Sequence, residues 1–212
     1  MKITLLVDLQ EHDTLAGEFG LSFMLETPGG DFLFDTGSDT ALQHNLAILN
    51  IPPEKVQKVI LSHGHYDHTG GLAHLAVKEI FCCCNITQTH YSYHGKDDIH
   101  NIAMPQAAQQ ILKSAKVNYI EKFTEIAHNL YLTGPIPRHS FEDCGGKFFH
   151  DTACTQIDTV SDEQALLTNN GVLITGCCHA GIINTLEYCK KIAPAINIHT
   201  IAGGLHLRNA SA

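Results

Sequence analysis

The chain has 212 residues, of which 44% are hydrophobic, and its 13 Lys and Arg against 22 Asp and Glu give a formal net charge of −9. This composition excludes disordered and fibrous proteins, and the acidic balance argues against a nucleic-acid partner. No apolar run approaches the roughly 18 residues of a membrane-spanning helix, and the first residues become polar too early for a signal peptide. We therefore expect a cytoplasmic protein with neither a nucleic-acid nor a membrane partner.

Short strands joined by tight turns are predicted for the first half of the chain. Apolar, β-branched stretches predict strands at residues 3–7, 21–26, 32–34, 59–61 and 80–84. Leu42, Leu46 and Leu49 recur at helical spacing and predict a helix. Asp39 or Thr40 is the expected cap at its N-terminus.

The middle of the chain, from about residue 85 to 160, is less regular. We expect it to be an insertion within a single domain that covers residues 1–212, because no linker-like segment interrupts the chain. A helix is predicted at 106–114 and a strand at 130–133. His90, His94 and His100 are expected in a loop, either as solvated residues or as contacts to a substrate or an extra metal.

Clear periodicity returns in the last third. Strands are predicted at 164–168, 171–175 and 196–201, and a helix is predicted to contain Ile182, Ile183, Leu186 and Cys189. The first part of the chain is predicted to be mainly strands, and the later part a mixture of strands and helices. This order indicates an α/β fold of stacked sheets covered by helices.

The chain also carries 15 histidines, more than its lysines and arginines together. Four ligand-type side chains fall within six residues in the motif His63-x-His65-x-Asp67-His68. On a strand the first three would share one face, while a turning loop would let His68 face a second ion. Imidazole nitrogens and a carboxylate oxygen suit zinc, and manganese or iron would accept the same set. Gly70 and Gly71 allow the tight backbone path that such a crowded loop needs.

Several stretches together resemble one protein family. The run from Leu61 to Gly71 resembles the metal-binding motif of the metallo-β-lactamase superfamily, and Asp35-Thr36-Gly37 resembles its first motif, in which a buried Asp supports the metal loop. Four further stretches resemble the branch named after the dihydropterin-ribofuranosylaminobenzene phosphate synthase: 132–138 with Phe141 and Glu142, 162–166, 175–185 and 202–207. The resemblance implies a four-layer αβ/βα sandwich of the metallo-β-lactamase type, shortened at the C-terminus.

A first metal site is implied for His179 together with two residues of the central motif. His179 lies between a predicted strand and a predicted helix, where the end of a strand exposes a side chain. By resemblance it completes a site with His63 and His65, and the alternative is a histidine that caps the helix or only forms hydrogen bonds.

A second metal site is expected from His206, which follows a strand and a double glycine. We expect it to join Asp67 and His68, with Asp67 also holding or orienting the nucleophile. Asp35 is expected to orient an imidazole through its other ring nitrogen rather than to bind the metal itself.

Two departures from the superfamily pattern bear on the metal count. Most hydrolases of the superfamily have a bridging Asp where this chain has Cys177, which is either a ligand or a buried thiol beneath the site. Relatives of the branch also continue beyond the motif that contains His206. Either His206 alone completes the second site, or that site is incomplete, or a neighbouring subunit supplies the missing ligand. A homo-oligomer is therefore one of the alternatives.

Arg138 is the candidate substrate-binding residue. It follows Pro135-Ile136-Pro137 in a rigid turn, where its guanidinium would clamp a phosphate or carboxylate or form a structural salt bridge.

These residues indicate a metal-dependent, hydrolase-like enzyme that uses a metal-bound hydroxide and one or two divalent ions, zinc first. The branch implies a phosphorylated or pterin-type small molecule as substrate and a possible transferase activity. The alternatives are an ester, thioester or lactone hydrolase and, from a different class, a non-catalytic metal- or ligand-binding protein.

Overall fold

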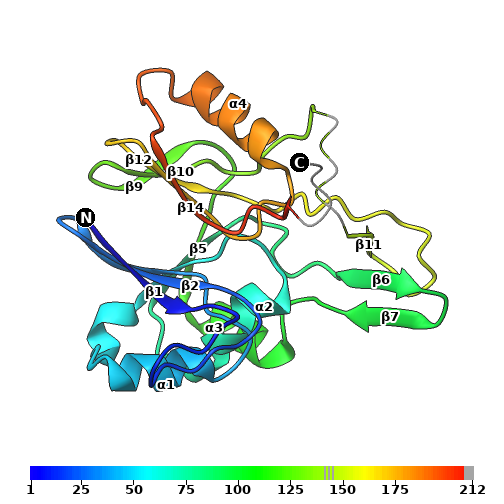
Figure 1. Ribbon diagram of the computed structural model, residues 1–212, viewed down its shortest axis with the longest axis horizontal. Coiled ribbons are helices and arrows are strands. Elements are labelled where there is room, and N and C mark those ends of the chain that lie inside the picture. Colours follow the sequence, from blue (N-terminus) through cyan, green and yellow to red (C-terminus); the bar gives the residue numbers. More distant parts are fainter. Residues whose placement is uncertain (141, 143, 145, 208–212) are drawn as a thin grey trace. The chain divides into compact units, whose positions relative to one another are not determined.

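The computed structural model describes residues 1–140, 142, 144 and 146–207. Phe141, part of one family-like stretch, lies outside the described residues. The chain divides into two compact units, and Figure 1 colours it along the sequence. Unit 1 is Met1–Cys82 with Met104–Tyr119, and unit 2 is Cys83–Ala103 with Ile120–Ala212. The single domain over 1–212 stays a prediction.

Unit 1 is built on a six-stranded sheet in the order β1-β2-β3-β4-β5-β8. Its strands are β1 (Lys2–Val7), β2 (Ser22–Thr27), β3 (Gly30–Phe34), β4 (Lys58–Ile60), β5 (Glu79–Cys82) and β8 (Lys116–Tyr119). The first three pair antiparallel, and the rest continue in parallel from β3. Leu33, Val59 and Ile80 are fully buried, which explains why the central strands read as continuous apolar runs.

The helices of unit 1 lie between these strands in the sequence. They are α1 (Ala41–Ile48), α2 (Tyr66–Thr69), α3 (Gln106–Ser114) and the 3₁₀ helices η1 (Pro53–Val56) and η2 (Gly70–His74). The predicted bounds of α3 are confirmed. Across the described residues, no helix has both the length and the apolar character needed to cross a membrane.

The N-terminus of α1 is capped differently from the prediction. Thr40 occupies the N-cap position, but its side chain forms no capping hydrogen bond. Instead, the carboxylate of Glu18 accepts hydrogen bonds from the backbone N–H groups of Ser38, Asp39 and Ala41 at 2.9, 3.1 and 3.3 Å. A distant carboxylate therefore accepts the backbone N–H of the first helical residue and those of two residues that precede the N-cap, a contact that local sequence patterns do not reveal.

Unit 2 contains a five-stranded sheet in the order β14-β13-β12-β10-β9. Its strands are β9 (Thr124–Ala127), β10 (Leu130–Leu132), β12 (Leu166–Thr168), β13 (Val172–Thr175) and β14 (Thr200–Gly203). Helix α4 (Ile182–Ile192) lies along this sheet in Figure 1, and its Cys189 packs in one cluster with Leu167 and Leu173. The strand predicted from residue 196 begins only at Thr200, so that part of the prediction is wrong.

Unit 2 also contains a three-stranded sheet, β11-β6-β7, within the stretch predicted to be irregular. Its strands are β6 (Tyr91–Gly95), β7 (Asp98–Asn101) and β11 (Phe148–Phe149). His94 and His100 therefore lie on a hairpin, not in a loop. The hairpin was missed because its strands are short and largely polar, which hides the alternation on which strand prediction depends.

Candidate metal site

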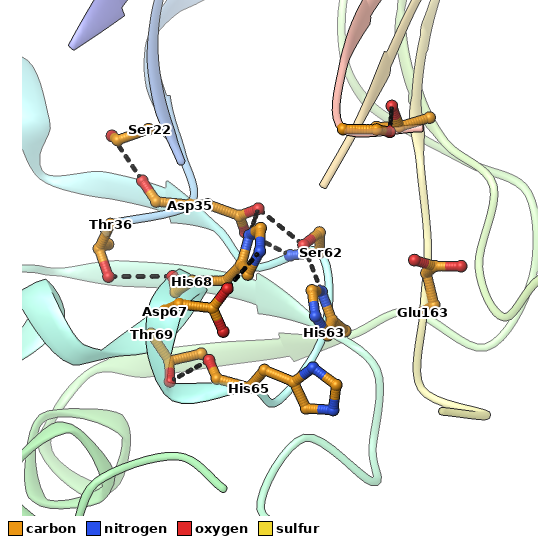
Figure 2. Close-up of polar contacts among 12 residues, drawn as sticks. Ser22, Asp35, Thr36, Ser62, His63, His65, Asp67, His68, Thr69 and Glu163 are labelled. Atoms are coloured by element: carbon orange, nitrogen blue, oxygen red, sulfur yellow. Dashed lines mark hydrogen bonds and ion pairs between the residues drawn. The ribbon is translucent and has the colours of Figure 1, made fainter. Parts of the chain in front are cut away.

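The central histidine motif lies where β4 ends and α2 begins, in unit 1. His63, His65, Asp67 and His68 are all buried, although each is polar or charged. The ring of His63 is 4.5 Å from that of His65 and 4.3 Å from that of His68, measured between centroids. The structure therefore brings three imidazoles and one carboxylate of the motif together, as Figure 2 shows.

Asp35 organises this cluster from the end of β3. Its Oδ2 atom is 2.7 Å from Nδ1 of His68 and 2.7 Å from Oγ of Ser62, and its Oδ1 atom accepts the backbone N–H of Ser62 at 2.7 Å. Oγ of Ser62 is in turn 2.8 Å from Nδ1 of His63. One fully buried carboxylate thus reaches one imidazole directly and a second through a hydroxyl (Figure 2).

These contacts fix which ring nitrogens can bind a metal. A carboxylate only accepts hydrogen bonds, so Nδ1 of His68 carries the proton that faces Asp35. The hydroxyl of Ser62 donates to Asp35, so its oxygen accepts a hydrogen bond from Nδ1 of His63. In both neutral rings the lone pair is then on Nε2, which is the form that a divalent ion binds.

The positions of Asp67 and His68 also fit a shared cation. Oδ2 of Asp67 and Nε2 of His68 are 3.4 Å apart, longer than an ordinary hydrogen bond. Two ligands that bind one zinc ion at about 2.1 Å with a tetrahedral angle are separated by about 3.4 Å. Burial raises the pKa of Asp67, but the neighbouring His68 and His65 outweigh this effect and lower it below its usual value. The donor set therefore suits a divalent ion.

Close backbone packing explains the two glycines that follow the motif. A Cβ atom on Gly70 would lie 1.9 Å from the carbonyl oxygen of Ser38, and one on Gly71 would lie 2.0 Å from that of Thr36. The backbone N–H and the hydroxyl of Thr36 both donate to the carbonyl of His68, at 2.9 and 3.0 Å. The end of β3 and the motif are thereby tied together, and only glycine fits the contact.

His179 and His206 are neighbours within unit 2. Their ring centroids are 4.5 Å apart, and the ring of Phe148 contacts His179 edge to face at 5.2 Å. His206 has a left-handed backbone conformation, with φ of 47°, and its Nδ1 atom hydrogen-bonds to the carbonyl of Cys144. Its Nε2 atom is therefore the nitrogen suited to a ligand.

The two cysteines before His179 differ in environment. Cys177 is half-buried, whereas Cys178 is buried. Burial raises the pKa of the Cys178 thiol to about 12, which opposes the thiolate form that binds metals. Of this pair, Cys177 is the better candidate for a ligand.

Arg138 opens onto a pocket of about 380 Å³ in unit 2 that also exposes Lys147, Phe148 and His179. Two carboxylates line the pocket, and both are engaged by donors. Those of Glu142 and Asp158 accept the backbone N–H groups of Ile183 and Val160 at 2.9 and 2.7 Å. Arg138 and Lys147 thus bring two cationic side chains to the lining of this pocket, the kind of group that binds an anionic ligand.

A buried histidine–carboxylate pair escaped the sequence analysis. His90, expected in a loop, is fully buried, and its Nδ1 atom is 2.5 Å from Oδ2 of Asp158. Burial lowers the pKa of His90, but the hydrogen bond to Asp158 and the charges of Asp162 and Asp158 together outweigh burial, so the net shift is upward. A separation of 68 residues gives no local signal for such a pair.

Glu163 was also missed as a site residue, although it lies in a family-like stretch. Its carboxylate accepts the backbone N–H groups of His179 and Ala180, both at 2.6 Å. Burial raises the pKa of Glu163 to about 7, while the two amides lower it. A lone glutamate before a strand carries no pattern that predicts this contact.

Comparisons with known proteins agree with the motif. The family model described as the metallo-beta-lactamase superfamily matches residues 15–147. An uncharacterized protein of Methanocaldococcus jannaschii is 30% identical over 212 residues, covering 99% of this chain and 80% of that protein. From the same organism, 7,8-dihydropterin-6-methyl-4-(beta-D-ribofuranosyl)-aminobenzene-5'-phosphate synthase is 27% identical over 213 residues, covering 91% of this chain and 72% of the synthase.

A solved structure extends the similarity to the fold. The crystal structure of Tm1679, a metal-dependent hydrolase of the beta-lactamase superfamily, matches with a TM-score of 0.82 and 31% identity. The match covers 99% of this chain and 78% of that one. The mixed α/β fold with its two larger sheets is thus similar to that of a metal-dependent hydrolase.

Proposed function

Because this chain belongs to the metallo-beta-lactamase superfamily, we propose that it is a metal-dependent, hydrolase-like enzyme. The observation that carries the proposal is the hydrogen bond between Asp35 and His68, together with the link from Asp35 through Ser62 to His63. The direct contact fixes the tautomer of His68, and the link through Ser62 fixes that of His63. In both rings Nε2 is then the nitrogen that can bind a metal. A histidine cluster without a metal would have no need for a buried carboxylate that sets ring tautomers.

His63, His65, Asp67 and His68 would supply the ligands that the motif contributes to one or two ions. Neutral imidazoles and one carboxylate favour zinc, with manganese or iron as alternatives. When bound, a divalent ion polarises a substrate oxygen and lowers the pKa of water, which is the chemistry that hydrolysis needs. We assign the catalytic role to Asp67. Besides binding an ion, its carboxylate would orient the attacking water and hold its proton.

The proposal keeps His179 and His206 as metal ligands on the family motif alone. The resemblance assigns His179 to the ion of His63 and His65, and His206 to a second ion. Cys177 remains a candidate where relatives carry a bridging carboxylate. The measured ratio of metal to protein decides whether one or two ions bind.

The proposed substrate is a small molecule with a phosphate or another anionic group. Arg138 and Lys147 supply positive charge in the pocket that also exposes His179, and Phe148 supplies an aromatic wall. The similarity to a pterin-pathway synthase adds pterin-type phosphates and a transferase reaction to the candidates. Hydrolysis of esters, thioesters or lactones requires the same activated water and is the competing activity.

Metal analysis tests the proposal first. Protein purified without added metal should contain one or two equivalents of a transition metal, and His63→Ala should lose the metal together with turnover. The assay panel contains phosphate mono- and diesters, thioesters and lactones. His100→Ala is the matched control, because this exposed histidine on β7 contacts Asp98 and the ring of His94, both on its own hairpin, and no residue of the motif among the contacts described for it.

Two results would reject parts of the proposal. Wild-type protein that stays free of metal when zinc or manganese is supplied would reject a metalloenzyme. Tight metal binding with no turnover across the panel would instead favour a non-catalytic metal- or ligand-binding protein.

A further inference from the structure

Two consecutive backbone amides in the loop between β13 and α4 point at the same carboxylate. The N–H groups of His179 and Ala180 donate to Oε1 and Oε2 of Glu163, each at 2.6 Å. Glu163 is only 2% exposed, so both hydrogen bonds are shielded from water. Charge-assisted hydrogen bonds of this length in a buried site are among the strongest that a backbone amide forms.

The loop has the shape of an anion-binding site that the protein fills itself. Cys178 before it and Gly181 after it have φ angles of 63° and 92°, and these left-handed turns bring successive N–H groups to one side. Such concave sets of amides bind anions. Because Glu163 occupies this position, the loop is locked by a side chain and is closed to an external anion.

The position of Glu163 is itself fixed by backbone contacts. Its N–H donates to the carbonyl of Val160 at 3.2 Å, and its carbonyl accepts the N–H of Ile136 at 3.0 Å. Val160, with φ of 51°, is held by a hydrogen bond from its N–H to the carboxylate of Asp158 at 2.7 Å. The carboxylate of Glu163 is therefore presented from a rigid segment.

From this geometry we propose that Glu163 is a positioning residue, which fixes the backbone of His179 so that its imidazole is held ready for a metal ion. The inference rests on the proposed function, in which His179 is a ligand. Phe148 restrains the ring from the other end through its edge-to-face contact at 5.2 Å. With backbone and ring both restrained, His179 loses little conformational freedom when it binds an ion.

The test is the Zn²⁺ affinity of the purified protein, measured by competition with a chromophoric chelator. Glu163→Gln preserves the size of the side chain. The NH2 group of the glutamine would, however, face one of the two backbone N–H groups, and two donors cannot form a hydrogen bond with each other. We expect it to weaken Zn²⁺ binding about tenfold, the lower end of the range for residues that orient metal ligands. His179→Ala should weaken binding in its own right.

A double variant separates positioning from general destabilisation. If Glu163 acts through His179, then Glu163→Gln combined with His179→Ala binds Zn²⁺ as weakly as His179→Ala alone. A merely structural role would instead weaken binding by the same factor in both backgrounds, which would overturn the inference.

Glu142→Gln is the matched control on the same loop and helix. The carboxylate of Glu142 accepts the N–H groups of Ile183 and Asn184 at 2.9 and 3.0 Å, the same kind of contact one turn later. We expect this variant to lower the thermal midpoint while Zn²⁺ affinity stays at the wild-type value.

The outcomes distinguish this inference from the proposed function. Wild-type affinity in Glu163→Gln, with weakened binding in His179→Ala, overturns the positioning role and leaves the metalloenzyme intact. Absence of Zn²⁺ binding by the wild type overturns both. Unchanged affinity in His179→Ala removes His179 from the ligand set and overturns the positioning role with it.

Discussion

At the scale of single residues, Asp35 is the side chain that most strongly shapes the candidate metal site in unit 1. It is fully buried and has a left-handed backbone conformation, with φ of 57°, at the point where β3 ends. Its backbone N–H donates to the carbonyl of Ile60 at 2.8 Å, so the carboxylate is fixed relative to the strand that leads into the motif. A carboxylate held this firmly can dictate the tautomers of the rings it contacts.

Replacement of Asp35 by Asn tests this control over the tautomers. An amide nitrogen at the position of Oδ2 would face the hydrogen-bond donors of His68 and Ser62, so the ring of His68 would have to shift its proton to Nε2. We expect a 10- to 100-fold loss of metal affinity, the range for groups that orient metal ligands. The broken buried network should also cost about 1–3 kcal/mol of folding free energy. Chelator competition and urea unfolding measure the two effects.

Ser62→Ala is the control for the Asp35 variant. It removes only the relay to His63 and leaves the hydrogen bond between Asp35 and His68, so its effect on metal affinity should be smaller. Wild-type affinity in Asp35→Asn would show that the tautomers are set by something other than this carboxylate.

At the scale of elements, one carboxylate reinforces a strand pair of the sheet and also links it to a helix outside the sheet. Glu26 on β2 is 2.8 Å from the ammonium of Lys2 on β1 and 2.7 Å from that of Lys55 in η1. Hydrogen bonds from Lys2 and Lys55 lower the pKa of Glu26 from 4.5 to about 2. The carboxylate thus links two strands and the 3₁₀ helix at the edge of the unit 1 sheet.

The lowered pKa of Glu26 predicts a dependence of stability on pH. A carboxyl group whose pKa is lower in the folded state stabilises the fold above its unfolded pKa, and the effect disappears as the pH falls through the folded pKa. Glu26→Gln should therefore unfold more easily than wild type at neutral pH, and the difference should vanish as the pH falls from 4.5 to about 2. Urea titrations across this range measure it.

Salt and a second glutamate provide the controls for Glu26. The pair is at the surface, so high salt should reduce the difference at neutral pH. Glu187→Gln, an exposed position on α4, should show no comparable dependence. A difference that persists unchanged at low pH would mean that Glu26 contributes through packing and not through its charge.

At the scale of the whole molecule, sequence predicts what depends on neighbouring residues and misses what depends on distant ones. The motif from His63 to His68 spans six residues, so its grouping follows from the local chain path. Helix α3 was predicted with its observed bounds because its apolar positions recur locally. Glu18 and Glu163, by contrast, act on amides that are 16 to 23 residues away, where no periodic pattern connects the partners.

Binding of a metal should be visible in the stability of the whole chain. A ligand that binds only the folded state adds about 2.7 kcal/mol at a concentration 100 times its dissociation constant. We therefore expect Zn²⁺ to raise the thermal midpoint of wild-type protein and EDTA to reverse the rise, while His63→Ala shows little change. The unfolded chain, with 15 histidines and 8 cysteines, also binds some Zn²⁺ and makes the observed rise smaller. Equal rises in wild type and His63→Ala would place the stabilising ion outside the motif, because the loss of one central imidazole would then have no energetic consequence.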